Sequence, residues 1–142
     1  MSNEWFYWAA ISAVFAALTA IFAKVGLQNI NSDFTTFIRT IVIIIALIAF
    51  LTYTGKWQPI AHISNKNWLF LILSGLATGI SWLAYFKALQ IGNASQVAPV
   101  DKFSLVLVTL FAVVFLGERP NEQEWAGIGL ISASVLLLAF KR

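Results

Sequence analysis

The sequence contains no cysteine and only one histidine, His62. Disulfide bonds and thiolate metal sites are therefore excluded, and a multi-histidine metal site cannot be assembled within one chain. A histidine-based catalytic centre is excluded in the same way, and nothing in the chain resembles a nucleophile–base pair or a metal site. We therefore expect a protein that is not an enzyme and that binds no cofactor and no metal.

Charged residues are also scarce, because they make up 11% of the 142 residues, whereas a soluble domain carries about 25%. The net charge of +3 is spread over the chain without a basic run, which argues against nucleic acid as a partner. Hydrophobic residues, in contrast, make up 60% of the chain. This composition predicts a single integral membrane domain over residues 1–142, with the lipid bilayer as its surroundings.

The hydrophobic residues form five long runs, and we predict transmembrane helices at residues 5–23, 34–53, 68–90, 94–116 and 125–140. A helix rises ~1.5 Å per residue, and the hydrocarbon core of a bilayer is ~30 Å thick. Helices are favoured even over the β-branched residues 41–48, because a segment in lipid must satisfy its own backbone hydrogen bonds. The loops are short, so neighbouring helices are antiparallel. The predicted fold is an all-α, multi-pass bundle in the cell membrane.

Five crossings place the two termini on opposite sides of the membrane. The N-terminal side carries Lys56, Lys66 and Arg119, whereas the other side carries Lys24, Lys87, Lys141 and Arg142, with Arg39 and Lys102 just inside. The positive-inside rule favours a cytoplasmic C-terminus, but the bias is weak. Insertion in both orientations therefore stays open.

Two charged residues, Asp101 and Lys102, lie within the fourth hydrophobic run, and Arg39 and Lys87 are predicted at a similar depth. A charge within a membrane costs at least ~2.5 kcal/mol on insertion scales and usually faces a cavity or a partner. One interpretation is a polar vestibule in which Asp101, Lys102 or Arg39 binds substrate or a coupling ion. The other is an ion pair of Asp101 with Arg39 or Lys102 that only holds the bundle together.

The third run contains Gly75 and Gly79 in a G-x-x-x-G spacing, which is typical of close helix–helix approach. Trp82 and Tyr85 continue this face toward the depth of the intramembrane charges. Two interpretations stay open: packing within the chain, or a cavity with Trp82 and Tyr85 as aromatic walls.

Two further features bear on how the helices bend and pack. Pro99 lies within the fourth run, where it removes one backbone hydrogen bond and predicts a kink that could act as a hinge. Gly129 and Ala133 give the fifth run a second face of small residues. That face suits a contact between two copies of the chain and suits lipid about as well.

Three stretches together resemble the EamA domain of the drug/metabolite transporter superfamily. They are Ala84-Tyr-Phe-Lys-Ala-Leu-Gln-Ile-Gly-Asn-Ala-Ser-Gln-Val-Ala-Pro-Val100, Leu116-Gly-Glu-Arg-Pro120 and Gly127-Ile-Gly-Leu-Ile131. The resemblance covers the whole chain as one five-helix unit, whereas common members contain two units of inverted topology. It therefore implies a homodimer, antiparallel as in the related small multidrug resistance proteins, that works by alternating access around a central cavity.

The chain departs from those multidrug proteins in one respect. Their first helix carries an embedded glutamate, whereas residues 5–23 contain no acid and Glu4 precedes them. Exchange of a cation for protons therefore does not carry over. Basic residues outnumber acidic ones within the predicted membrane region, which favours an anionic or zwitterionic substrate over a lipophilic cation.

We conclude from the sequence that the protein is a secondary transporter of a small anionic, zwitterionic or amine metabolite, with export as one possible direction. The alternative is a membrane scaffold or accessory subunit that transports nothing itself, in which case Asp101 and Lys102 serve packing only.

Overall fold

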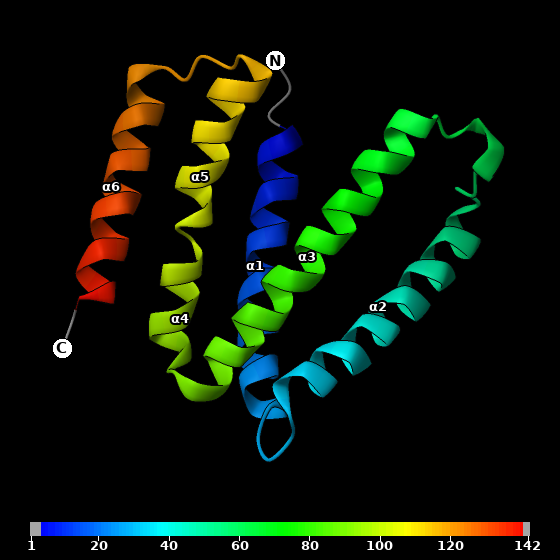
Figure 1. The fold of residues 1–142 in the computed structure, drawn as a ribbon, viewed down its shortest axis with the longest axis horizontal. Coiled ribbons are helices and arrows are strands. Elements are labelled where there is room, and N and C mark those ends of the chain that lie inside the picture. The colour runs from blue at the N-terminus through cyan, green and yellow to red at the C-terminus, as the bar shows by residue number, and fades with distance from the viewer. Residues whose placement is uncertain (1–3, 141–142) are drawn as a thin grey trace. The chain divides into compact units, whose positions relative to one another are not determined.

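The computed structural model describes residues 4–140, and every regular element in that range is helical (Figure 1). In chain order the elements are α1 (Glu4–Gly26), α2 (Ser32–Thr54), the 3-10 helix η1 (Ile60–His62), α3 (Asn65–Ile91), α4 (Ala94–Asp101), α5 (Ser104–Phe111), the π-helix η2 (Ala112–Leu116) and α6 (Glu122–Ala139). The predicted all-α fold is confirmed. Lys141 and Arg142, which entered the topology argument, lie outside the described residues.

Four stretches within the described range are long and apolar enough to cross a membrane: Glu4–Gly26, Ser32–Thr54, Asn65–Ile91 and Ala94–Leu116. They match the first four predicted spans to within a few residues at each end. The fifth, α6, has 18 residues and is not among them. Its first turn contains Glu122 and Glu124, which lower the hydropathy of the helix as a whole.

The chain divides into two compact units, one made of the residues up to Ala20 together with those from Gly92 onward, and the other of Ile21–Ile91. Most large apolar side chains on the helices of both units are exposed to the surroundings. Because a bilayer is as apolar as these side chains, such a surface is what a membrane protein requires. The prediction of one domain over residues 1–142 stays a prediction.

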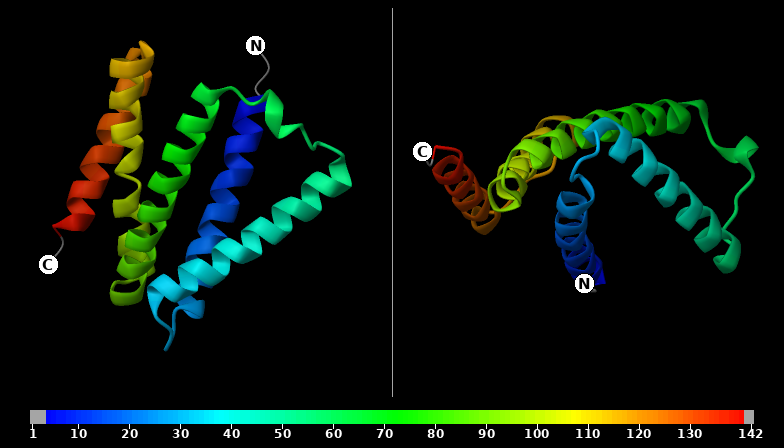
Figure 2. Two further views of the ribbon diagram at one scale, coloured as in Figure 1. Left: turned by 45° about the vertical axis from the view of Figure 1, so that its right-hand side comes forward. Right: turned by 90° about the horizontal axis from the view of Figure 1, so that it is seen from below.

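Within the unit Ile21–Ile91, helix α2 packs along α3. The two helices lie close together where α2 begins and α3 ends, and they spread apart toward their connecting loop (Figures 1 and 2). Asn31 fixes the start of α2, because its side chain accepts hydrogen bonds from the backbone N–H groups of Asp33 and Phe34 at 2.9 and 3.2 Å. Gly55 ends α2 in the left-handed conformation, with φ of 65°.

In the other unit, α4 and α5 both pack against α6. Asn121 and Glu124 form a capping box at the start of α6, in which each side chain accepts a hydrogen bond from the backbone N–H of the other residue. This cap places the first turn of α6 three residues before the predicted start of the fifth span. The chain turns at Gly117 directly after η2, and Gly117 has a φ of 68°.

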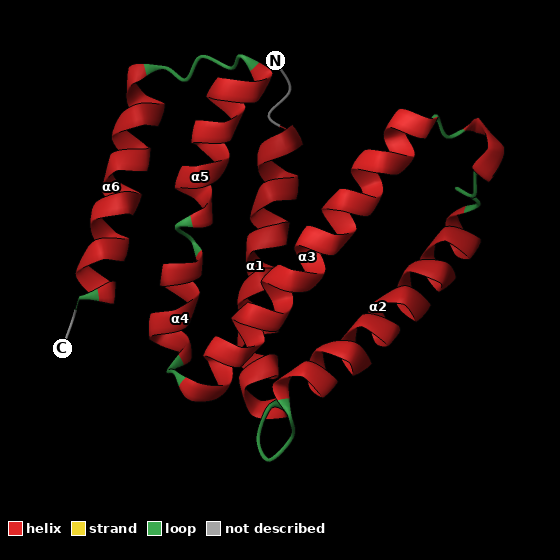
Figure 3. Cartoon of the chain, viewed as in Figure 1, coloured by secondary structure: helices red, strands yellow, loops and turns green. Residues whose placement is uncertain are grey.

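The fourth span is interrupted rather than continuous. A turn at Lys102 and Phe103 separates α4 from α5 (Figure 3). Pro99 lies inside α4, and the N–H groups of Lys102 and Phe103 bond to carbonyls only three residues back, at 3.1 and 3.0 Å. The interruption lies three residues after Pro99, whereas a proline disturbs the helical turn that precedes it, so the predicted kink at Pro99 stays a prediction. Whether this break acts as a hinge stays a prediction.

Candidate functional site

Arg39 lies on α2, and its guanidinium stacks on the ring of Phe86 from α3, with 4.0 Å between Cζ and the ring centroid. Its Nη1 atom is buried and has no hydrogen-bond partner among residues 4–140. Tyr85 precedes Phe86 on α3, and its ring contacts the Phe86 ring edge-on, with 5.4 Å between the centroids. Two predicted site residues, Arg39 and Tyr85, are therefore brought together, with one donor of the arginine left unsatisfied.

The threonine hydroxyl groups next to Arg39 differ from its guanidinium because each of them has a hydrogen-bond acceptor. Thr36 donates to the carbonyl of Ser32 at 2.8 Å, and Thr40 donates to the carbonyl of Thr36 at 2.8 Å. These bonds satisfy the threonines within their own helix. Unlike these hydroxyl groups, the Arg39 guanidinium keeps a donor atom, Nη1, that no described residue engages.

A small core holds α2 and α3 together near Arg39. Phe86 and Leu89 of α3 are almost completely buried, and so is Ser32 at the start of α2. Two further hydrogen bonds fix the end of α3. Lys24 Nζ donates to the carbonyl of Leu89 at 2.5 Å, and Gln90 Nε2 donates to the carbonyl of Ile30 at 2.7 Å. The stacking partner of Arg39 is therefore held on a well-packed support.

Trp82 is half-buried and precedes Phe86 by one helical turn, so both lie on the same side of α3. Gly75 and Gly79, farther along the helix, are exposed, and a Cβ added to either would meet no described atom within 4 Å. Gly129 on α6 is equally open. A close-packing role of these three glycines stays a prediction, because it requires a neighbour beyond those in the described chain.

Asp101 and Lys102 form an ion pair in which Nζ and Oδ2 are 3.8 Å apart. The Lys102 side chain is 54% exposed and that of Asp101 is 37% exposed. The pair forms between adjacent residues because α4 ends at Asp101 and Lys102 lies in the turn that follows. The distance between the two charged atoms is long, and both side chains are accessible. The role of these residues in binding or coupling stays a prediction.

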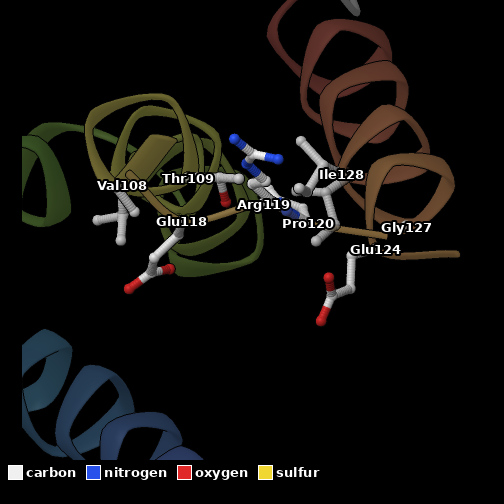
Figure 4. A pocket seen from close by; sticks show the side chains of 10 residues that line it. Val108, Thr109, Glu118, Arg119, Pro120, Glu124, Gly127 and Ile128 are labelled. Carbon is white, nitrogen blue, oxygen red and sulfur yellow. The ribbon is translucent and has the colours of Figure 1, made fainter. Parts of the chain in front are cut away.

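The unit that contains α5 and α6 has a pocket of about 520 Å³ that sequence analysis did not predict. It lies between the end of the fourth span and the start of α6 (Figure 4). Its lining combines apolar side chains with charged ones, namely Glu118, Arg119 and Glu124. The signal in the sequence that could have indicated this pocket is the concentration of charge at residues 118–124. Within the described residues, no group of three or more His, Cys, Asp or Glu could hold a metal ion.

Comparison with known proteins identifies the family. The model of the EamA-like transporter family matches residues 3–140. The chain belongs to this family. The resemblance inferred from residues 84–100, 116–120 and 127–131 is therefore confirmed, and this EamA-like protein is a membrane protein of a transporter family.

The relatives of this EamA-like protein carry transporter names. An "uncharacterized transporter in cobO 3' region" from Sinorhizobium sp is 57% identical over 98% of this chain and 99% of its own length. The "uncharacterized transporter YxxF" from Bacillus subtilis is 29% identical over 95% of this chain, which spans 42% of that relative. A "probable 4-amino-4-deoxy-L-arabinose-phosphoundecaprenol flippase subunit ArnE" from Hamiltonella defensa is 36% identical over 60% of this chain and 75% of its own length. No solved structure matches the chain.

Proposed function

We propose that the protein is a secondary transporter that carries a small anionic or zwitterionic metabolite across the cell membrane. The observation that carries this proposal is the Arg39 guanidinium, which stacks on Phe86 within a hydrophobic span. Its Nη1 atom is buried and has no partner in the part of the chain that the structure describes. A buried donor without an acceptor is unfavourable by about 1–3 kcal/mol, and more for a charged group. An anion that enters the site would remove this penalty.

Arginine is suited to this role by its shape. Its planar guanidinium carries five N–H donors and binds a carboxylate or phosphate through two parallel hydrogen bonds. Stacking on Phe86 fixes the plane of the group without using its N–H donors. We assign Arg39 to the anionic group of the substrate, with Tyr85 and Trp82 as aromatic walls on α3.

For assembly, we propose an antiparallel homodimer that works by alternating access, with Asp101 or Lys102 as a substrate-binding or proton-coupling group. The chain spans 42% of the YxxF relative, as expected if that relative contains two such units. The weak Lys/Arg bias supports insertion in both orientations, which an antiparallel dimer requires. The break after Pro99 lies directly beside Asp101 and Lys102, and it could change the position of the charged pair between two states.

The test is flux into proteoliposomes that contain the purified chain. A panel of radiolabelled carboxylates, amino acids and phosphorylated metabolites is offered, together with a lipophilic cation as a negative control. We expect flux of an anionic or zwitterionic compound, and Arg39→Leu should raise the concentration of that compound needed for half-maximal flux about 10- to 100-fold. Flux of the lipophilic cation alone, unchanged in Arg39→Leu, would contradict the proposal.

A second candidate function is that of an accessory subunit within a larger transporter. One specific observation favours it, namely that several relatives similar over 58–60% of the chain are named as flippase subunits. The name of these relatives also describes a substrate with an amino group and a phosphate. Under this alternative the purified chain would give no flux alone and would gain it when a second membrane protein is added.

A further inference from the structure

The pocket between α5 and α6 is lined by neither Arg39 and Phe86 nor the Asp101–Lys102 pair. Its apolar part is made by side chains from α5 and α6, chiefly Val108, Ile128 and Ile131. Its polar part is made by the loop and the first turn of α6, which contribute Glu118, Arg119 and Glu124. The pocket thus has a charged end and an apolar end, and its volume of about 520 Å³ is in the range of ligand sites.

The charged end of the pocket combines two carboxylates with one guanidinium. Figure 4 shows the guanidinium of Arg119 extending away from the carboxylates of Glu118 and Glu124, which lie apart from each other below it in this view. Glu124 is fixed, because its Oε2 accepts a hydrogen bond of 2.7 Å from the backbone N–H of Asn121. Among the described residues, no hydrogen bond or ion pair engages the Glu118 carboxylate or the Arg119 guanidinium. Two carboxylates and one guanidinium leave the pocket with a net negative charge.

The pocket also lies where a bilayer changes from water to hydrocarbon. The fourth span ends at Leu116, and the charged residues follow directly after it. Ile131 lies nine positions after Glu122, which begins α6, and this separation corresponds to about 13 Å along the helix. The apolar end therefore reaches the depth of the acyl chains, and a small water-soluble amine would leave it uncovered.

We propose that this pocket binds a phospholipid whose headgroup carries a primary amine. The ammonium group donates hydrogen bonds to Glu118 and Glu124, and Arg119 binds the phosphate. The first part of an acyl chain covers Val108, Ile128 and Ile131. A quaternary ammonium headgroup has no N–H donor, and an anionic headgroup is repelled by the two carboxylates, so both bind more weakly.

The experiment measures lipid retention by the full chain with native mass spectrometry. The protein is reconstituted with equal amounts of phosphatidylethanolamine, phosphatidylcholine and phosphatidylglycerol and is then transferred to a mild detergent. We expect selective retention of phosphatidylethanolamine, and a loss of selectivity of about tenfold in Glu118→Gln combined with Glu124→Gln, because charge-assisted hydrogen bonds are removed. Glutamine keeps the capping-box position of residue 124. Glu118→Gln alone, which leaves that cap untouched, should lose part of the selectivity.

Glu122→Gln is the matched control, because it removes the same charge from the first turn of α6 at a residue that does not line the pocket. It should retain the selectivity of the natural chain. Equal retention of the three lipids would overturn the proposal, and so would an equal effect of Glu122→Gln, which would indicate general surface charge. Free ethanolamine that raises the melting temperature as much as the lipid does would also overturn it, since the occupant would then be a water-soluble amine.

Discussion

Replacement of Arg39 by leucine should separate transport from stability. Arg39 follows the start of α2 at Ser32 by seven positions, which places it ~10 Å along the helix, about a third of the way across a ~30 Å hydrocarbon core. A charge at the bilayer centre costs ~2.5–3.5 kcal/mol on insertion scales, and the cost is smaller nearer the surface. Leucine removes this cost.

The same substitution also removes the stacking on Phe86, and a desolvated cation–π contact contributes ~2 kcal/mol. The two effects oppose each other, so the free energy of unfolding of Arg39→Leu should stay within about 1–2 kcal/mol of the natural value. A charge-assisted hydrogen bond to an anionic substrate, in contrast, is worth ~1.5–3 kcal/mol, so the substrate concentration for half-maximal flux should rise about 10- to 100-fold.

The assay combines thermal unfolding, followed by tryptophan fluorescence, with flux of the panel compound that the natural chain carries fastest. Arg39→Lys keeps the charge but lacks the planar fork, and it should recover part of the flux. Lys87→Leu is the matched control, because it removes a basic residue from an exposed position on α3 and should leave flux unchanged. If Arg39→Leu transports normally, or if flux is lost only in proportion to a large loss of folded protein, Arg39 is a structural residue and the reasoning is refuted.

Asp101→Asn combined with Lys102→Gln should change the free energy of unfolding by less than ~1 kcal/mol, because an exposed ion pair contributes little, yet it should abolish flux; normal flux would remove the pair from the mechanism. Gly79→Leu meets no described atom in the chain, so it should leave the monomer folded but lower the dimer fraction in cross-linking and the flux; an unchanged dimer would indicate that this face contacts lipid. Reporter fusions at the C-terminus should show both orientations in the membrane, whereas a single orientation together with a monomeric mass in mild detergent would rule out the antiparallel dimer.

The positions of the helices could be predicted from the sequence because the bilayer limits the choices to long apolar runs. The ends were less well predicted, since polar caps extend helices beyond the apolar run. Asn121 and Glu124 have the capping-box spacing, and they begin α6 three residues before the predicted start at Trp125. In the same way, Asn31 caps α2 before its apolar run begins. Pro99 predicted a kink, but the π-helix Ala112–Leu116 has no comparable signal in the sequence.

For the candidate site, the residues could be predicted from the sequence but their contacts could not. Arg39 was predicted because a charge inside an apolar run can be recognised in the sequence itself. Tyr85 was predicted because it is an aromatic residue at a similar depth. The stacking of Arg39 on Phe86 could not be predicted, because it depends on how α2 and α3 pack and not on any spacing within either helix. The contact uses the face of the guanidinium, while its Nη1 atom is buried without an acceptor among residues 4–140. An arginine paired with a carboxylate would only stabilise the fold, because its donors would be occupied. An arginine that stacks on an aromatic ring keeps its donors available for an anion.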